Sequence, residues 1–289
     1  MSEITRVGVA GCGLMGSGIA EVCARAGLDV VVREIDDAAA AAGRARLEVS
    51  LGRAVRAGKL TAEDRDAALA RLRITTRLAD LADRELVIEA ATENPGVKAA
   101  LFAELDRAVE SPEAILATNT SSIPIAQVAQ ATTRPAQVLG LHFFNPVPVQ
   151  RLVEVIPSVL TSPQAVQRAG DLVTKTLGKT VIKAPDRSGF VVNALLVPYL
   201  LAAIRMLDAG HATADDIDLG MTLGCAHPMG PLRLADLIGL DTLQAVADSM
   251  YEEHKEPLDA APPLLRRMTE AGLLGRKSGR GFYDYQAQT

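Results

Sequence analysis

The glycine-rich stretch near the amino end of the chain restricts its fold more than any other feature. A short apolar run, TRVGVA, leads directly into GCGLMGSG, and an apolar stretch of helical character follows. Gly11, Gly13 and Gly16 therefore form a GxGxxG motif between a predicted strand and a predicted helix. In this context the first glycine permits a tight turn, the second lets the backbone approach a pyrophosphate, and the third allows close strand–helix packing. We predict a dinucleotide site here, with Leu14 and Met15 also at the cofactor.

An acidic residue follows at the distance that such a site requires. Glu34 ends the second apolar run, DVVVRE, 18 residues after Gly16, and its carboxylate would accept hydrogen bonds from the adenosine ribose hydroxyls. A carboxylate at this position repels the 2′-phosphate of NADP, so NAD is the predicted cofactor. Arg33, next to it, would attract that phosphate if its side chain turned outward, which leaves NADP open as an alternative.

Short apolar runs alternate with helical stretches through the first two thirds of the chain. This alternation predicts an α/β fold with a Rossmann-type, mostly parallel sheet covered on both faces. After Ser188 only helical periodicity remains, and APDRSG marks the boundary. We predict a dinucleotide-binding domain over residues 1–186 and a smaller all-α domain over 187–289. The predicted strands are 5–10, 29–34, 86–90, 114–118, a hairpin around 148 and KTVIKA, and the predicted helices are 37–57, one after an N-cap at Thr61, 97–109 and 163–177.

Two polar residues lie inside the apolar runs of LHFFNPVPVQRLVEV. His142 and Glu154 are each six residues from Pro148, so a hairpin centred on that proline would place them opposite each other, with Cβ atoms about 5 Å apart. Such a pair is either a satisfied polar pair in the core or, beside a dinucleotide site, a general base with its orienting carboxylate. The glycine motif favours the second interpretation.

A basic helix interrupts an otherwise acidic chain. The formal net charge is −5, yet residues 44–59 hold five basic side chains and one acid, Glu48. One interpretation is a solvated helix face, and the other is an anion site for a ligand with several phosphates. Because the glycine loop would already hold the cofactor pyrophosphate, the second interpretation implies another phosphorylated ligand. The basic residues are Arg44, Arg46, Arg53, Arg56 and Lys59.

Composition argues against several other classes of protein. The negative net charge does not suit a nucleic-acid partner, and three cysteines without metal-like spacing predict reduced thiols and no metal site. The most apolar stretch, 190–204, spans 15 residues and contains a proline, too short for a bilayer. The start, MSEITRVGVAG, does not resemble a signal peptide. We expect a soluble cytoplasmic protein that binds no membrane and forms a homodimer through its C-terminal helical domain, which this apolar helix begins.

With these features placed, the chain resembles the short-chain L-3-hydroxyacyl-CoA dehydrogenase family, most closely its bacterial 3-hydroxybutyryl-CoA dehydrogenase branch. The resemblance implies reversible, NAD-dependent oxidation of short-chain (S)-3-hydroxyacyl-CoA, such as 3-hydroxybutyryl-CoA, to the 3-oxoacyl-CoA, with the helical domain also contacting substrate. It runs essentially from end to end, through VGVAGCGLMGSGIAEV, LVIEAATENPGVK, ATNTSS, LGLHFFNPVPVQRLVEVI, LGKTVIKAPDRSGFVVN, CAHPMGPLRLADLIGLD and GRKSGRGFYDY.

The resemblance also implies roles for individual positions. His142 would be the catalytic base and Glu154 its partner, while Ser121 and Asn193 would contact substrate oxygens. The phosphates of coenzyme A would supply the ligand of the basic helix. Positions implied at the coenzyme A moiety are Ser50 together with Arg53, Arg56 or Lys59 in the place of a family lysine, and positions implied along the cofactor are Glu93, Lys98, Ser121, Asn145 and Lys277.

Two positions depart from the family pattern. Ser188 stands where the family often has proline, and Ala194 stands where an arginine often follows the asparagine. Gly189 should keep the turn, whereas the missing arginine removes a charge near the domain junction. Two other functions stay open: a dehydrogenase for a 3-hydroxy acid without coenzyme A, and a dinucleotide-binding protein without turnover. The presence of both members of the histidine–glutamate pair argues against the last.

Overall fold

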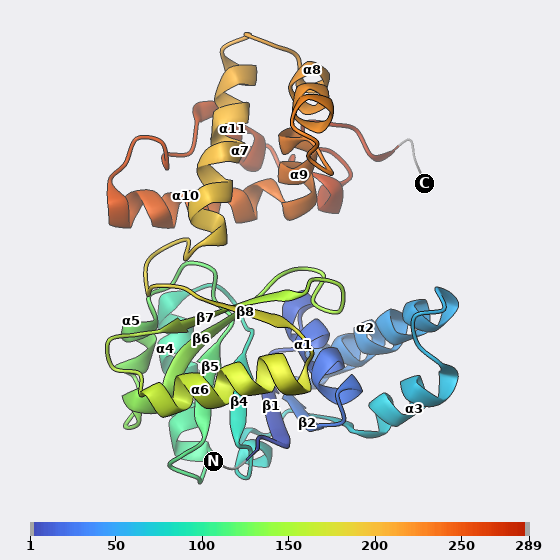
Figure 1. The fold of residues 1–289 in the computed structure, drawn as a ribbon, viewed down its shortest axis with the longest axis vertical. Helices are drawn as coiled ribbons and strands as arrows, with labels where there is room; N and C mark the ends of the chain where they lie inside the picture. Colours follow the sequence, from blue (N-terminus) through green and yellow to red (C-terminus); the bar gives the residue numbers. More distant parts are fainter. Residues whose placement is uncertain (1–2, 287–289) are drawn as a thin grey trace. The chain divides into compact units, whose positions relative to one another are not determined.

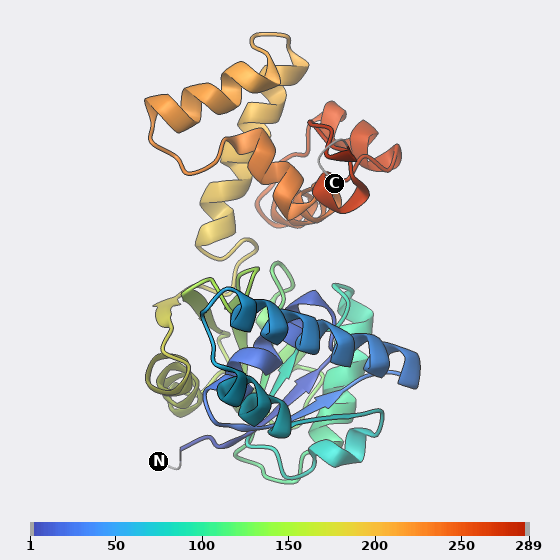
Figure 2. The ribbon, with the colours of Figure 1, turned by 90° about the vertical axis from the view of Figure 1, so that its right-hand side faces the viewer.

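The computed structural model describes residues 3–286, which form two compact units. The first unit extends to Asp186 and the second begins at Arg187. As predicted, the first is a mostly parallel sheet with helices on both faces, and the second is helical (Figures 1 and 2).

One eight-stranded sheet forms the centre of the first unit, in the order β3-β2-β1-β4-β5-β6-β7-β8. The strand order reverses at β1, which lies between β2 and β4, and open α/β sheets bind ligands outside the carboxyl ends of the strands at such a point. Neighbouring strands are parallel except for β6 and β7. The strands are β1 (Arg6–Ala10), β2 (Asp29–Arg33), β3 (Leu72–Thr75), β4 (Leu86–Glu89), β5 (Ile115–Thr118), β6 (Val138–Phe143), β7 (Leu152–Pro157) and β8 (Thr180–Lys183).

The strand β3 is not predicted from the sequence. Its four residues, LRIT, include exposed Arg73 and only one buried side chain, Leu72. β3 is the edge strand beside β2, and an edge strand does not need the continuous apolar character of a central one. The sequence of β3 therefore resembles a continuation of the helix that precedes it, which ends at Ala70.

The helices of the first unit begin at side-chain caps where the sequence offers them. Thr61 Oγ1 accepts from the Asp64 N–H at 3.0 Å, which confirms the predicted N-cap, and Asn94 Oδ1 accepts from the Val97 N–H at 3.0 Å. The helices are α1 (Leu14–Arg25), α2 (Asp37–Arg56), α3 (Ala62–Ala70), α4 (Pro95–Ala108), α5 (Ile125–Ala129) and α6 (Pro163–Asp171), with short helices η1 (Leu78–Leu81), η2 (Pro135–Gln137) and η3 (Leu172–Thr176).

A continuous apolar core lies between the sheet and the helices on one of its faces. Ile19 of α1 and Leu47 of α2 pack with Val30 of β2, and all three are at most 2% exposed. The opposite residues of the strands are also buried, as Val31 and Val87 show. Burial on both faces explains why the central strands are apolar without alternation.

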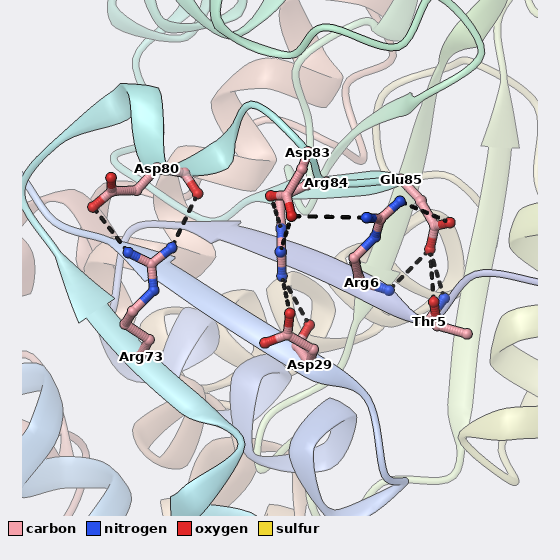
Figure 3. Close-up of polar contacts among 8 residues, drawn as sticks. All are labelled: Thr5, Arg6, Asp29, Arg73, Asp80, Asp83, Arg84 and Glu85. Atoms are coloured by element: carbon pink, nitrogen blue, oxygen red, sulfur yellow. Dashed lines mark hydrogen bonds and ion pairs between the residues drawn. The ribbon is translucent and has the colours of Figure 1, made fainter.

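The amino edge of the sheet carries a group of ion pairs (Figure 3). Arg84, which is 3% exposed, donates to Asp29 at 2.9 Å and to Asp83 at 2.7 Å. Glu85 accepts from the backbone N–H groups of Thr5 and Arg6 at 2.8 and 3.0 Å. These bonds join the starts of β1, β2 and β4.

The second unit is built around α7, whose inner residues Leu200, Leu201 and Ile204 are fully buried. Asp236 of α9 accepts from the backbone N–H groups of Phe282 and Tyr283, both at 3.0 Å, and so holds the carboxyl-terminal segment against the helices. No helix among residues 3–286 is both long and apolar enough to span a membrane. The helices are α7 (Val192–Asp208), α8 (Ala214–Leu219), α9 (Pro231–Ile238), α10 (Leu240–His254) and α11 (Pro263–Glu270), with η4 (Gly220–Gly224) and η5 (Arg276–Ser278).

Candidate active site

The glycine loop follows β1 at the carboxyl edge of the sheet. Gly11 has φ +98°, and a Cβ there would lie 2.8 Å from the Ala90 carbonyl oxygen. A Cβ on Gly16 would lie 1.9 Å from the Gly11 carbonyl oxygen, so packing within the protein requires both glycines. A Cβ on Gly13, in contrast, would meet no atom within 4 Å. The loop is therefore open at Gly13, where a pyrophosphate would approach the backbone.

Glu34 and helix α2 hold the glycine loop from two sides. The Glu34 carboxylate accepts hydrogen bonds from the backbone N–H of Cys12 and, at 3.0 Å, from that of Ile35. Arg46 Nη1 donates to the Cys12 carbonyl oxygen at 3.0 Å, and a Cβ on Gly43 would lie 2.7 Å from Cys12 Sγ. Burial, with the nearby Glu34 carboxylate, raises the pKa of the Cys12 thiol to about 11. The loop thiol is thus neutral near pH 7 and leaves the loop without added negative charge.

His142 and Glu154 meet across the β6–β7 hairpin in the predicted register. His142 Nδ1 lies 2.6 Å from Glu154 Oε2, and the two residues are 7% and 0% exposed. Because an ionised carboxylate only accepts hydrogen bonds, Nδ1 carries the hydrogen and the basic lone pair is directed to Nε2. The imidazole also packs against Phe144, with ring centroids 4.6 Å apart. This pair has the geometry of a general base and its orienting carboxylate.

Two further residues position the hairpin. Asn119, directly after β5, accepts the Phe143 N–H at its Oδ1 at 2.8 Å and so fixes the end of β6. Lys179 donates to the carbonyl oxygens of Val147 and Gln150 at 2.8 and 2.6 Å, which closes the loop between β6 and β7. Both residues therefore constrain the hairpin that carries His142 and Glu154.

A chain of charged side chains, two of them buried, leads from β4 to the loop after β5. Lys98 Nζ donates to the two Glu89 oxygens at 2.8 and 2.9 Å and lies 3.2 Å from Glu93 Oε2. Glu93 Oε1 accepts from Thr120 Oγ1 at 2.5 Å and from the Ser121 N–H at 2.9 Å. Burial raises the pKa of Glu93, but the Lys98 charge and these hydrogen bonds outweigh it and hold the pKa below its ordinary value. The carboxyl is therefore ionised at neutral pH.

The structure brings one part of the predicted site together at the carboxyl edge of the sheet. Ser121 follows β5 and Asn145 follows β6, which are neighbouring strands. The predicted residues at this edge are Gly11, Gly13, Leu14, Met15, Gly16, Glu34, Glu93, Lys98, Ser121, His142, Asn145 and Glu154.

The predicted coenzyme A positions lie on or just beyond α2. Ser50, Arg53 and Arg56 are within the helix, and Lys59 follows it. Within residues 3–286, Arg53, Arg56 and Lys59 form no salt bridge. Their charges are therefore not neutralised by the protein itself.

Two predicted site residues, Asn193 and Lys277, belong to the second unit. Asn193 is half-buried in the first turn of α7. Lys277 is 45% exposed and forms an ion pair with Asp241.

Ser188, which stands where the family often has proline, forms hydrogen bonds that a proline could not form. The Ser188 N–H donates to Glu253 Oε2 at 2.8 Å, and its Oγ lies 2.8 Å from Ser249 Oγ. Gly189 has φ +83°, so the glycine keeps the turn as expected. The departure is therefore accommodated by polar contacts with α10.

Several residues at the site are not predicted from the sequence. Glu89 is an acid inside the apolar run LVIEA, the same signal that identifies Glu154, so it could have been found. Gly43 and Asn119 have no such signal, since their roles come from contacts between segments distant in sequence. Arg46 is identified only as part of the basic helix, and its bond to the glycine loop is not predicted.

The charged residues on either side of His254 in the sequence predict an exposed side chain, and this prediction is wrong. Its side chain is 17% exposed, and its Nδ1 lies 2.9 Å from Asp259 Oδ2. The run of charged residues around it suggests a solvated position, but the segment after α10 folds back over the ring. Among residues 3–286, no group of three or more histidine, cysteine, aspartate or glutamate side chains is arranged to hold a metal ion.

Two domains of one known protein family match this chain. The 3-hydroxyacyl-CoA dehydrogenase NAD binding domain matches residues 6–187, and the 3-hydroxyacyl-CoA dehydrogenase C-terminal domain matches residues 189–285. The chain belongs to the 3-hydroxyacyl-CoA dehydrogenase family.

Relatives and solved structures match along nearly the whole chain. A 3-hydroxybutyryl-CoA dehydrogenase of Mycobacterium tuberculosis is 60% identical over 282 residues, which cover 98% of this chain and 99% of the relative. The human mitochondrial hydroxyacyl-coenzyme A dehydrogenase is 41% identical over 98% of this chain and 92% of its own. The crystal structure of an (S)-3-hydroxybutyryl-CoA dehydrogenase from Ralstonia eutropha is 45% identical, covers 98% of this chain and 100% of that one, and has a TM-score of 0.92.

Proposed function

We propose that this protein is an NAD-dependent 3-hydroxyacyl-CoA dehydrogenase that interconverts (S)-3-hydroxybutyryl-CoA and acetoacetyl-CoA. The observation that carries this proposal is the 2.6 Å contact between His142 and Glu154, at the same sheet edge as the glycine loop. A dinucleotide site without an adjacent base would only bind its ligand. The names of relatives at 45–60% identity support the choice of substrate.

The chain supplies the proton transfer of this reaction. NAD, when bound, would supply the acceptor for the hydride of the substrate's carbinol carbon. His142 Nε2 takes the hydroxyl proton in the same direction of reaction and returns it in reduction. Glu154 holds the ring in the required tautomer and stabilises the imidazolium as it forms. Ser121 and Asn193 would bind the substrate oxygens.

The residues at the carboxyl edge fit NAD. The open side of the loop at Gly13 gives the backbone room to approach a pyrophosphate, and Glu34 lies where the adenosine ribose would be bound. Leu14 and Ile35 are 67% and 74% exposed beside these groups. A bound dinucleotide would cover such apolar side chains. Glu93, Lys98, Asn145 and Lys277 are the remaining cofactor positions that we propose.

The basic surface of α2 suits the phosphates of coenzyme A. Arg53, Arg56 and Lys59 carry three charges without a salt-bridge partner in the described part of the chain, and Ser50 lies about one turn before Arg53. A substrate without coenzyme A would make no use of this surface. Reversal of the three charges should therefore raise the KM for the acyl-CoA substrate, and an unchanged KM would favour a 3-hydroxy acid without coenzyme A.

We assign the first unit, 1–186, to dinucleotide binding and the second, 187–289, to substrate contact and dimerisation. Large apolar side chains of the second unit are exposed, with Leu195 at 75% and Leu223 at 78%, and a second copy of the chain would cover them. The three cysteines are free, and Cys225 is exposed. A free exposed thiol suits the reducing cytoplasm, which is where we propose that the enzyme works.

The test follows NADH and NADPH oxidation at 340 nm with acetoacetyl-CoA, for the wild type and for His142→Ala. We expect turnover with NADH, weak turnover with NADPH, and a loss of about 100- to 10,000-fold in the variant. A variant with wild-type activity would mean that the histidine is only a core residue. Turnover mainly with NADPH would mean that attraction of the 2′-phosphate by Arg33 outweighs its repulsion by Glu34.

A further inference from the structure

We propose that Glu89 is a positioning residue that acts through Lys98 and Glu93 on Ser121. The proposal rests on the proposed dehydrogenase function, because Ser121 is one of its substrate-contacting residues. Glu89 itself is 0% exposed, so it reaches the reacting groups only through other side chains.

The position of Glu89 is fully determined by four hydrogen bonds. Its Oε1 accepts from the Ala91 N–H at 2.7 Å and from Lys98 Nζ at 2.8 Å. Its Oε2 accepts from Thr118 Oγ1 at 2.7 Å and from Lys98 Nζ at 2.9 Å. Ala91 follows β4 and Thr118 ends β5, so the carboxylate is tied to two adjacent strands of the sheet. It is a rigid reference point for the loops beyond these strands.

Lys98 transmits this position to Glu93. The ammonium group has three hydrogens, and it faces three oxygens, two of Glu89 and one of Glu93. Lys98 is 1% exposed, and a buried ammonium group is stable only when it is paired. Glu89 supplies that pairing whether or not Glu93 moves, so Lys98 stays paired and in place.

Glu93 is the member of the chain that reaches the site. Its side chain is 38% exposed, and its Oε1 accepts from both the N–H and the Oγ of Ser121, at 2.9 and 3.3 Å. Thr120 and Ser121 hold Oε1 of the Glu93 carboxylate, whereas the anchored ammonium group holds Oε2. Loss of the ammonium group would therefore leave the carboxylate free to turn about Oε1. Misplacement of a substrate-binding group by about 1 Å can cost about 100-fold in rate.

The first experiment measures kcat and KM for acetoacetyl-CoA with NADH in Glu89→Gln. The matched control is Asp106→Asn, which breaks another buried carboxylate–cation pair, with Arg134, at the other end of α4. We expect both variants to lose thermal stability, and only Glu89→Gln to lose about tenfold or more in kcat. Equal kcat in the two variants would overturn the proposal and leave Glu89 as a structural residue.

A second variant separates activity from stability if Glu89→Gln folds poorly. Glu89→Gln combined with Lys98→Met removes both buried charges and should recover stability, since no unpaired charge remains. The positioning role requires that kcat stays low in this stable variant. Recovery of kcat together with stability would overturn it.

A double-mutant cycle tests whether the effect passes through Ser121. In the Ser121→Ala background, Glu89→Gln should change kcat by less than about twofold, because the group that it positions is already gone. If the double variant instead showed the product of the two single-variant losses in kcat, the proposal would be overturned. A wild-type protein inactive with every 3-hydroxyacyl-CoA would instead contradict the proposed function, so the two failures are distinguishable.

Discussion

At the amino edge of the sheet Arg84 lies between two aspartates, and at the carboxyl edge Lys98 lies between two glutamates. The cations are equally buried, with side chains 4% and 1% exposed, but their partners differ. Asp29 and Asp83 are 57% and 53% exposed, so water solvates them whether or not the arginine is present.

The partners of Lys98 continue the chain of contacts. One is fully buried, and the other, Glu93, bonds onward to Thr120 and Ser121. The same arrangement of a cation between two carboxylates thus ends in solvent at the amino edge and continues into the loops that follow the strands at the carboxyl edge. We expect the first to affect stability alone and the second to affect the proposed site as well.

The largest contrast between the two edges should come from a pair of glutamates. Glu154→Gln removes the charge that holds the His142 tautomer, and we expect kcat to fall about 1,000-fold with little change in melting temperature. Glu85→Gln changes a carboxylate that accepts only from the amino-edge residues Thr5 and Arg6, so kcat should stay at the wild-type value. Steady-state kinetics would give kcat, and thermal melts the melting temperature, of both variants. Similar kcat values would mean that the edges do not differ in function.

A second pair of variants separates the glycine that folding requires from the glycine that cofactor binding requires. Gly16→Ala places a methyl group against the Gly11 carbonyl oxygen and should cost at least about 3 kcal/mol of stability. The added methyl group of Gly13→Ala would have no atom of residues 3–286 within 4 Å, so this variant should fold normally and weaken NADH binding at least about tenfold. Urea denaturation and NADH fluorescence titration measure the two effects. Undiminished NADH affinity in Gly13→Ala would exclude the open side of the loop as the pyrophosphate site.

Replacement of the buried cation at the amino edge should affect stability alone. Arg84→Met keeps the apolar stem and leaves two solvated aspartates, so we expect a loss of about 1–2 kcal/mol in the free energy of unfolding. Arg6→Met is the exposed control and should lose under about 1 kcal/mol, because the Arg6 side chain is 46% exposed. Neither variant should change kcat. A loss of activity in Arg84→Met would show that the amino edge influences the site.

The smallest effect concerns acid stability. Burial raises the pKa of Glu85, but hydrogen bonds from Thr5 and Arg6 outweigh it and hold the pKa below its ordinary value. On acidification the unfolded chain therefore binds a proton before the folded one does, and the contribution of Glu85 to stability, complete above about pH 5, declines as the pH falls. The free energy of unfolding should fall less steeply with decreasing pH in Glu85→Gln than in the wild type. Parallel pH profiles from urea denaturation would contradict this assignment.

Local patterns in the sequence were sufficient for most of the central strands and for the pairing of His142 with Glu154. The hairpin register is predictable because His142 and Glu154 are equally distant from Pro148, and strand pairing has a period of two residues. The N-cap at Thr61 is equally local. The edge strand β3 was missed because only its inner side is buried, so its pattern is too weak to distinguish it from a helix end.

The sequence by itself determined the dinucleotide motif, the α/β class and the pair His142–Glu154, since each depends on spacing along the chain. Only the tertiary structure decided that Gly43 admits the Cys12 side chain, that Asn119 holds the end of β6, and that Glu89 reaches Ser121 through two intervening side chains. Such contacts join segments whose distance in space is set by the packing of the whole sheet with its helices. No local pattern records that distance.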